Sequence, residues 1–516
     1  MNNNNILIGD QVEDSFLARN RLMQFSILLL LFLTAFGIRV YGITNIPMDY
    51  HPVKQYRSAL TARAIYYSQQ EDINELEKKT AIASLKYIGI LGPPIVDYIA
   101  ASAYTILGTE VLWIPKLLST IYWIIGGLFL YLIAREMMNA DAAILVTAIY
   151  LFLPFGVLSS QSFQPDPLMI MAMIISVYTI IIYHSRPSAK MLFIAGIVSA
   201  AAVLIKPVSV FIIFGAYLGY HIHCKGLTRN FFFDQNLIIF SIITLLPSTL
   251  YYGYGIVNTA TLDQQAQKSF VPQLFFQFNF WDGWLKRIKI AMGFDIFIGS
   301  LLSAFLFISG WQKKLIFGMW SGYLLMCLVF NYTISTHDYY HLPLFPIAAL
   351  SLGPAAALLF NKLRTQTNRW YLELGVWVLL AIALFLSAGT TIQASRRLPE
   401  YENEIRIAEE IGEAVSHSTN TIMLAPYDGK PLMYYGKLAG KYWPYWYDIR
   451  DEKLWGVEDM LPIERLGSLS KDMDLEYFVI TDLEELENQK DLMNFLDETY
   501  PIRVRKPGYV IYQMSR

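Results

Sequence analysis

Three aspartates and several cationic residues lie in polar stretches between long apolar blocks. The aspartates are Asp49, Asp97 and Asp166. A positioned carboxylate can take the proton from an attacking hydroxyl group, and cations stabilise the charge on a departing phosphate. This combination predicts transfer of a group from a phosphate-linked donor to a hydroxyl, with one of the three aspartates as the base. The phosphate contacts would come from five residues: Lys206, Arg57, Arg63, Lys54 and His51.

A further polar segment, STHDYYHLPL, carries two histidines four positions apart. Together with Asp338, the side chains of His337 and His341 would suit a divalent metal ion, the one cofactor that the sequence suggests. The alternative is that these three residues are ordinary polar groups at a membrane interface. Cys224 and Cys327 build neither a disulfide framework nor a Cys-based metal site.

The other candidates also have structural interpretations. Asp166 stands between two prolines ahead of an apolar block, so it caps a helix, with or without a catalytic role. Lys206 either contacts phosphate or extends its ammonium group to the interface. Asp97 is either functional or structural. The aromatic run 442–447 (YWPYWY) either binds a sugar or lipid or, as we favour, packs an outer domain onto the membrane.

The composition indicates which elements position these residues. Of the 516 residues, 55% are hydrophobic and 16% are charged, against about 45–50% and ~25% in soluble domains. The apolar residues form blocks of about 20, the length of a membrane-spanning helix. The net charge of −2 gives no attraction to nucleic acid. We therefore expect a polytopic α-helical membrane protein embedded in membrane lipid.

Eleven spans are expected. Residues 43–111, after the first span, form a large loop with an amphipathic surface helix over 55–70 and a second surface or re-entrant helix over 93–107. Lys206 and Pro207 mark a break between two spans, because proline disrupts a helix. The expected spans are 22–42, 112–134, 142–160, 166–183, 190–205, 207–222, 236–254, 291–309, 315–331, 342–360 and 371–392.

The distribution of lysine and arginine predicts the orientation. These residues occupy every second turn, as the positive-inside rule requires of cytoplasmic turns, whereas the turns 161–165 and 332–341 contain neither. The tail 1–21 is therefore expected on the cytoplasmic side of a plasma membrane or bacterial inner membrane. The candidate residues then fall on the outer side.

Residues 393–516 follow the transmembrane domain 22–392 and have a different character. Charge rises, apolar runs shorten, and helical and strand patterns alternate, which predicts a small α/β domain in the periplasm or extracellular space. The expected helices lie near 400–416, 456–466 and 488–498. The expected strands are 421–425, 476–481 and 509–514.

Residues 22–360 resemble the GT-C glycosyltransferases, in particular bacterial relatives of protein O-mannosyltransferases and lipid A aminoarabinose transferases. The resemblance rests on the order and spacing of several segments. These are YRSALTARAIYY, GPPIVDYIAASAYTILG with IPKLLSTIYWIIGGLFLYLIAREM, SQSFQPDPLMIM, and LIKPVSV with HDYYHLPLFP.

The resemblance implies a polyprenyl-phosphate sugar donor and an active site at the outer face. It makes Asp166 a carboxylate of the catalytic site and Lys206 a phosphate contact. The sequence departs from the family in the first loop, where HPVKQYR replaces an acidic pair and Asp49 is the nearest carboxylate. It also has Gly92 before Pro93, where the family often has an acidic residue.

We therefore expect a glycosyltransferase that moves a sugar from a lipid-linked donor to an acceptor hydroxyl, with inversion. The acceptor would be a glycan, a lipid or a protein. A transporter or flippase of saccharides is the main alternative, but it would place charges at mid-membrane and often shows internal repeats. A non-catalytic membrane scaffold would explain the outer domain but not the polar residues of the loops.

Overall fold

The computed structural model describes residues 21–228, 231–307, 310–366 and 398–515, with scattered positions between 371 and 389. The expected tail and most of the last expected span, 371–392, lie outside these residues. The chain divides into two compact units. One unit comprises Met1–Ile43, Lys116–Gln161 and Pro165–Gln393, and the other comprises Thr44–Pro115, Ser162–Gln164 and Ala394–Arg516.

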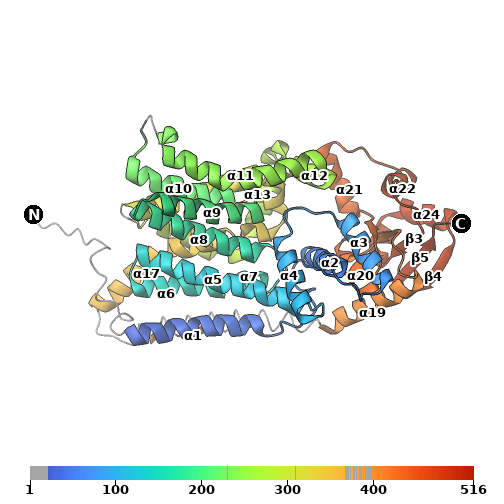
Figure 1. Ribbon diagram of the computed structural model, residues 1–516, viewed down its shortest axis with the longest axis horizontal. Coiled ribbons are helices and arrows are strands. Elements are labelled where there is room, and N and C mark those ends of the chain that lie inside the picture. Colours follow the sequence, from blue (N-terminus) through green and yellow to red (C-terminus); the bar gives the residue numbers. More distant parts are fainter. Residues whose placement is uncertain are drawn as a thin grey trace, which may run out of the picture. The chain divides into compact units, whose positions relative to one another are not determined.

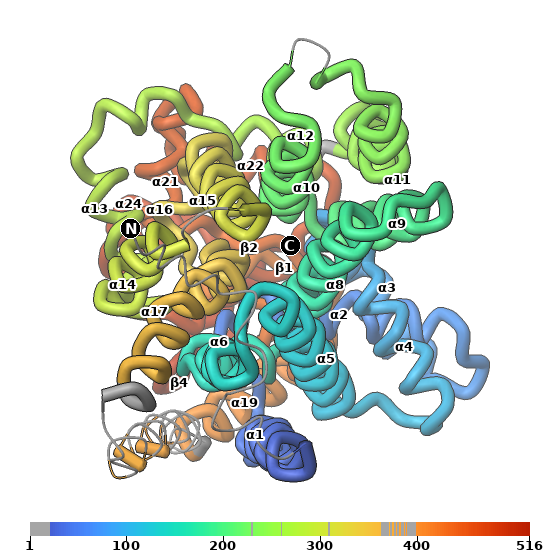
Figure 2. The backbone as a smooth tube through the Cα atoms, turned by 90° about the vertical axis from the view of Figure 1, so that its left-hand side faces the viewer, coloured from blue at the N-terminus to red at the C-terminus, as the bar shows by residue number. Residues whose placement is uncertain are grey.

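The first unit is a bundle of helices, which run side by side in Figure 1 and are seen in cross-section in Figure 2. Its helices are α1(Arg21–Val40), α5(Trp113–Met137), α6(Ala140–Phe152), α7(Pro154–Ser159), α8(Asp166–Ser185), α9(Ala189–Ile205), α10(Ser209–Lys225), η2(Phe231–Phe233), α11(Gln235–Asn258), α12(Ala260–Ser269), η3(Pro272–Phe276), α13(Phe278–Met292), α14(Phe294–Ala304), α15(Trp311–Val329), α16(Asn331–Thr336), η4(Asp338–His341) and α17(Leu344–Gln366).

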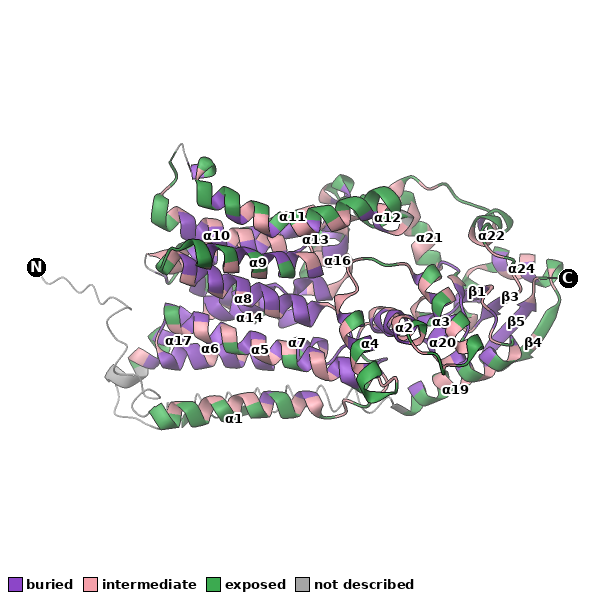
Figure 3. Ribbon diagram, in the orientation of Figure 1, coloured by how far each residue is buried: buried purple, intermediate pink, exposed green. Residues whose placement is uncertain are grey.

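Each of the first ten expected spans contains a helix. Among the described residues, five helices (α1, α5, α8, α11 and α17) are long and apolar enough to cross a membrane. Figure 3 shows that α1 and α11 expose much of their surface while α6 and α8 are buried. Exposed leucines such as Leu30 and Leu33 on α1 suit a lipid environment. The number of crossings stays a prediction.

Two boundaries differ from expectation. The expected span 142–160 is interrupted before Pro154, where α6 ends and α7 begins, because proline cannot continue the hydrogen-bond ladder. Where one span was expected over 291–309, the structure has two helices, α13 and α14, of which α13 begins well before residue 291. They are separated by Gly293, whose φ of 81° is left-handed. Glycine adopts this conformation without the steric penalty of a Cβ atom.

Helices α10 and α15 approach at backbone distance. Gly215 and Gly219 on α10 face Gly318 and Gly322 on α15, and each pair has the GxxxG spacing. A Cβ atom on Gly318 would lie 2.1 Å from the carbonyl oxygen of Gly215. Small residues at this spacing allow membrane helices to pack closely, so these glycines fix the α10–α15 contact.

The second unit combines the first loop with the C-terminal residues. The loop supplies α2(Pro52–Ser68), α3(Glu75–Ile88) and α4(Ile95–Leu107). The C-terminal part supplies α19(Leu398–Ala414), β1(Thr421–Leu424), η5(Pro426–Gly429), α20(Lys430–Gly436), β2(Gly440–Tyr442), α21(Trp446–Glu452), η6(Lys453–Trp455), α22(Pro462–Ser470), β3(Tyr477–Ile480), α23(Leu483–Asn488), α24(Lys490–Thr499), β4(Ile502–Lys506) and β5(Tyr509–Gln513).

Helix α2 occupies the interior of this unit. It was expected as an amphipathic helix lying on a surface, but ten of its residues are buried. It packs against α3, α4 and α20. Small residues such as Ala59, Ala62 and Ala64 let these neighbours approach, so α2 is enclosed on several sides.

The C-terminal residues form the expected α/β fold. The sheet order is β2-β1-β3-β5-β4. Strands β2, β1 and β3 are parallel, and β5 is antiparallel to both of its neighbours, β3 and β4. The three expected strands are β1, β3 and β5, while the edge strands β2 and β4 were not foreseen. Trp443, from the aromatic run, is buried in the core beside Phe478, whereas Tyr442, Trp446 and Tyr447 stay partly exposed.

Candidate functional site

The helical unit joins two of the predicted site residues in a buried ion pair. Lys206 Nζ donates a hydrogen bond to Asp166 Oδ1 over 2.6 Å. The Asp166 side chain is fully buried, and 13% of the Lys206 side chain is exposed. The pair therefore presents a cation whose own position is fixed by a carboxylate.

Local sequence explains why both residues lie at the same end of the helical hairpin α8–α9. Asp166 is the first residue of α8, between Pro165 and Pro167. Lys206 follows the last residue of α9 in an extended conformation, φ −156° and ψ 117°, because the residue before Pro207 is disfavoured in the helical region. The predicted helix break at Lys206 and Pro207 is thus confirmed.

Asp166 does not act as an N-cap. The N-cap residue of α8 is Pro165, and no side chain caps this helix. The carboxylate instead pairs with Lys206, although a negative charge in the first turn also suits the helix dipole. Helix capping alone therefore does not explain this residue.

Two tyrosines complete the surroundings of the ammonium group. The Nζ of Lys206 lies 4.3 Å from the ring centroid of Tyr340 and 4.9 Å from that of Tyr339. Both distances are within the range of cation–π attraction. The sequence drew attention to the histidines of this segment, and its two tyrosines were missed. No local signal could have linked them to Lys206, because the tyrosines lie in the turn 332–341, far from Lys206 in the sequence.

The proposed metal ligands do not converge. Both ring nitrogens of His341 are engaged, Nδ1 with the Tyr323 hydroxyl at 2.6 Å and Nε2 with the carbonyl oxygen of Ile334 at 3.1 Å. His337 Nδ1 contacts the Thr336 hydroxyl. Within the part of the chain that the structure describes, no three His, Cys, Asp or Glu side chains are grouped to hold a metal ion.

The second unit holds the other two predicted aspartates, of which Asp49 is exposed and Asp97 is buried. The side-chain amide of Gln55 donates a hydrogen bond to the carbonyl oxygen of Tyr50, the residue after Asp49, over 2.6 Å. This bond fixes the backbone beside Asp49. His51, next to the helix start, has a left-handed backbone with φ 45°. Such a conformation in a non-glycine residue is strained and is found often at functional sites.

Asp97 lies between α4 and α2. It accepts a hydrogen bond from Ser58, and burial raises its pKa to about 7 despite that bond and the nearby Arg57. A carboxyl group with a pKa near neutrality is suited to proton transfer. Only 7% of Asp97 is exposed, whereas Asp49 is an exposed residue.

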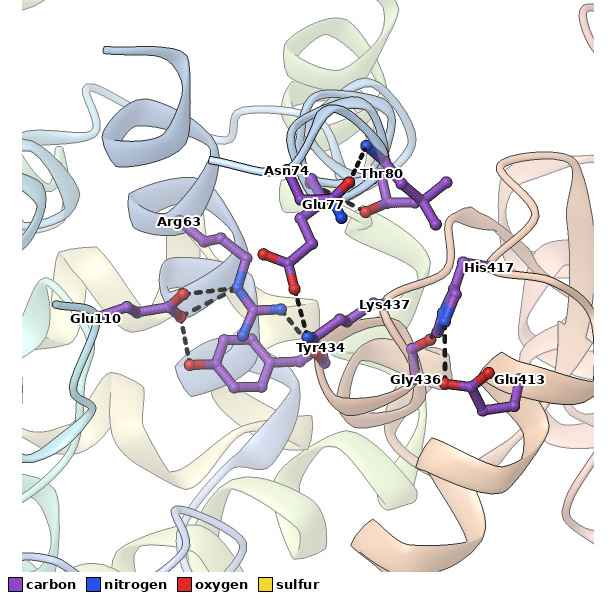
Figure 4. A network of polar contacts seen from close by, with 11 residues as sticks. Arg63, Asn74, Glu77, Thr80, Glu110, Glu413, His417, Tyr434, Gly436 and Lys437 are labelled. Atoms are coloured by element: carbon purple, nitrogen blue, oxygen red, sulfur yellow. Dashed lines mark hydrogen bonds and ion pairs between the residues drawn. The ribbon is translucent and has the colours of Figure 1, made fainter. Parts of the chain in front are cut away.

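The arginines of α2 are engaged in structural contacts. Arg57 Nη1 donates to the carbonyl oxygens of Ile88 and Gly89. Arg63 Nε lies 2.9 Å from Glu110 Oε2, and its guanidinium group covers the ring of Tyr434 at 3.5 Å (Figure 4). These contacts occupy Arg63, so it is less available for phosphate. Lys54 and His51 flank the same helix start as Asp49, and their predicted role stays a prediction.

Comparison with known proteins identifies the fold. Residues 92–252, which include Asp97, Asp166 and Lys206, match the family model described as dolichyl-phosphate-mannose-protein mannosyltransferase. The structure of ArnT from Cupriavidus metallidurans bound to undecaprenyl phosphate is similar, with a TM-score of 0.59 and 13% identity over 94% of this chain and 97% of that chain. The chain has the GT-C fold.

A second GT-C structure agrees. The oligosaccharyltransferase of Archaeoglobus fulgidus, tethered with an acceptor peptide containing the NVT sequon, gives a TM-score of 0.60 and 13% identity over 96% of this chain and 74% of that chain. The sequence matches none of the curated proteins. The expected GT-C architecture, a polytopic helical domain with a small C-terminal α/β part, is therefore confirmed as a fold.

Proposed function

We propose that this GT-C protein transfers a sugar from a polyprenyl-phosphate-linked donor to an acceptor hydroxyl at the outer face of the membrane, with inversion. The observation that carries the proposal is the Lys206 ammonium group, fixed by Asp166 and by the rings of Tyr339 and Tyr340. A lysine has three N–H donors, and one of them serves Asp166. The others can bind the oxygens of a phosphate.

The proposal gives each group a chemical task. Lys206 stabilises the phosphate that departs with the lipid, because a fixed cation acts where negative charge develops. Asp49 takes the proton from the acceptor hydroxyl, as its exposure allows. The undecaprenyl phosphate bound to ArnT supports a lipid phosphate as the leaving group. Orientation follows from the positive-inside rule, with the N-terminus cytoplasmic and the C-terminal residues outside.

The test is the thermal stability of the protein in lipid nanodiscs with and without undecaprenyl phosphate. A ligand that binds only the folded state raises the melting temperature, so we expect a rise in the wild type and little or none in Lys206→Ala. Lys286→Ala, which removes a lysine that is 68% exposed, should respond like the wild type. An unchanged wild-type melting temperature at saturating lipid would overturn the proposal.

A further inference from the structure

The polar segment 159–164 (SSQSFQ) was expected at the end of a span and in an outer turn, and the structure buries it. Each of its polar side chains is at most 9% exposed. Gln161 shows how such a side chain is accommodated, because its Nε2 donates to the carbonyl oxygens of Ile38 and Arg39 over 3.2 and 2.9 Å. A buried amide needs such partners in place of the hydrogen bonds that it loses to water.

Gln164 is the exception in this segment. Only 1% of the residue is exposed, and neither Nε2 nor Oε1 has a hydrogen-bond partner among the residues that the structure describes. Most buried polar side-chain atoms in proteins are hydrogen-bonded, and a buried group that is not requires a specific explanation. Packing alone gives none, because an apolar side chain of the same size would fill this position at lower cost.

The backbone next to Gln164 is held by Gln55 of α2. The Oε1 of Gln55 accepts a hydrogen bond from the N–H of Phe163 over 3.0 Å, while its Nε2 donates to the carbonyl oxygen of Tyr50. Gln55 is itself 1% exposed, and both ends of its amide are used. Within the second unit, one side chain thus links the residue before Gln164 to the residue after Asp49.

The amide of Gln164 is complementary to one kind of group. A carboxamide has two N–H donors and a carbonyl acceptor. The oxygens of an ionised phosphate only accept hydrogen bonds and an ammonium group only donates them, so either would leave one end of the amide unpaired. Hydroxyl groups both donate and accept. Two neighbouring hydroxyls of a sugar ring therefore satisfy both ends of the amide at once.

We propose that Gln164 binds hydroxyl groups of the transferred sugar, and that Gln55 ties it to Asp49 for this purpose. The inference rests on the proposed function, in which Asp49 takes the proton of the acceptor hydroxyl and so marks where acceptor and sugar meet. Because 1% of Gln164 is exposed, the sugar reaches the amide by displacing the side chains that cover it. The amide gains its hydrogen bonds only then, which favours a glycosylated lipid over the bare lipid phosphate.

Gln164→Met separates this role from a structural one, because methionine has a similar shape and does not replace the amide. Without ligand, its melting temperature in nanodiscs should equal or exceed that of the wild type, since an unpaired buried amide is removed. Affinities come from the thermal shift with undecaprenyl phosphate, bare or carrying mannose, glucose or galactose, without acceptor. The wild type should bind at least one glycosylated lipid about tenfold more tightly than the bare lipid, and Gln164→Met should bind both equally.

Gln489→Met is the matched control in the same unit. The Nε2 of Gln489 donates to the carbonyl oxygen of Pro444, and its Oε1 accepts from Trp443 Nε1. This change should lower the melting temperature and keep the preference for the glycosylated lipid.

Three results would overturn the inference while the bare lipid still binds: a wild type without preference, a preference that survives in Gln164→Met, or a loss of stability in Gln164→Met as large as in Gln489→Met. If no undecaprenyl phosphate, bare or glycosylated, shifts the wild-type melting temperature, the proposed function itself fails, and the inference fails with it.

Discussion

The Nζ of Lys206 donates to Oδ1 of Asp166 over 2.6 Å, with the carboxylate fully buried. The two residues are 40 positions apart and are brought together by the antiparallel helices α8 and α9. Burying a lone charge is costly, so each residue makes the burial of the other tolerable. The pair serves stability and, in our proposal, the fixed position of the phosphate contact.

This coupling predicts non-additive effects of substitution. Lys206→Met leaves a buried carboxylate without its cation, and Asp166→Asn removes the carboxylate that holds the ammonium group. Each change should cost about 3–5 kcal/mol, and the double variant should cost clearly less than their sum. Thermal or denaturant unfolding in a fixed lipid mixture measures all three.

An exposed pair provides the comparison. Lys286 and Asp282 on α13 are also 2.6 Å apart, but their side chains are 68% and 38% exposed. The same substitutions there should change stability by only about 0.3–0.5 kcal/mol. Strict additivity at Lys206 and Asp166 would mean that the pair is not energetically coupled.

Local patterns in the sequence were sufficient to predict the elements around this pair. A lysine before Pro207 ends one apolar block and a proline-flanked Asp166 begins another, so both helix boundaries follow from the backbone limits of proline. Strands β1, β3 and β5 were also predictable from local sequence, because each is a short run of buried apolar residues. Edge strands β2 and β4 carry no such run, as IRVRK illustrates, and were missed.

Contacts between distant segments could not be predicted in the same way. Arg63 was expected to bind phosphate, because a sequence shows a charge without its partners. The structure supplies Glu110, 47 residues away, and Tyr434, 371 residues away. Tyr339 and Tyr340 were overlooked for the same reason, since only folding places them over Lys206. The enclosure of α2 likewise depends on partners from both ends of the chain.

Asp49→Asn should abolish most transfer activity while sparing donor binding. Loss of a general base reduces the rate by about 10²–10⁴-fold, and the amide has nearly the same shape as the carboxylate. The turnover number is measured with a polyprenyl-phosphate sugar, and donor binding by the undecaprenyl phosphate thermal shift. A variant with full turnover would move the role of the base to Asp97 or Asp166.

Asp97 should make stability depend on pH. Its folded pKa is about 7 because of burial, against about 3.9 in an unfolded chain. The folded state thus holds this proton more tightly, so the contribution is fully present below about pH 4 and is lost as the pH rises through 7. The melting temperature of the wild type should fall over this range relative to that of Asp97→Asn.

The full effect is on the order of 4 kcal/mol, from three pH units at 1.36 kcal/mol each. Asp72→Asn removes an exposed aspartate of the same unit and should follow the wild-type pH profile. Parallel profiles for wild type and Asp97→Asn would show that the pKa of this carboxyl group is the same in the folded and unfolded protein.

Gly318→Ala tests the contact between α10 and α15. The added methyl group would meet the carbonyl oxygen of Gly215 at 2.1 Å, which is far inside van der Waals distance, so the two helices must separate. We expect a loss of about 1–3 kcal/mol, the usual cost of overpacking. Gly253→Ala on α11 meets nothing within 4 Å and should be neutral or slightly stabilising, because alanine favours a helix more than glycine does. Equal melting temperatures for the two variants would show that α10 and α15 adjust without cost, and the glycines would then not determine how closely these helices pack.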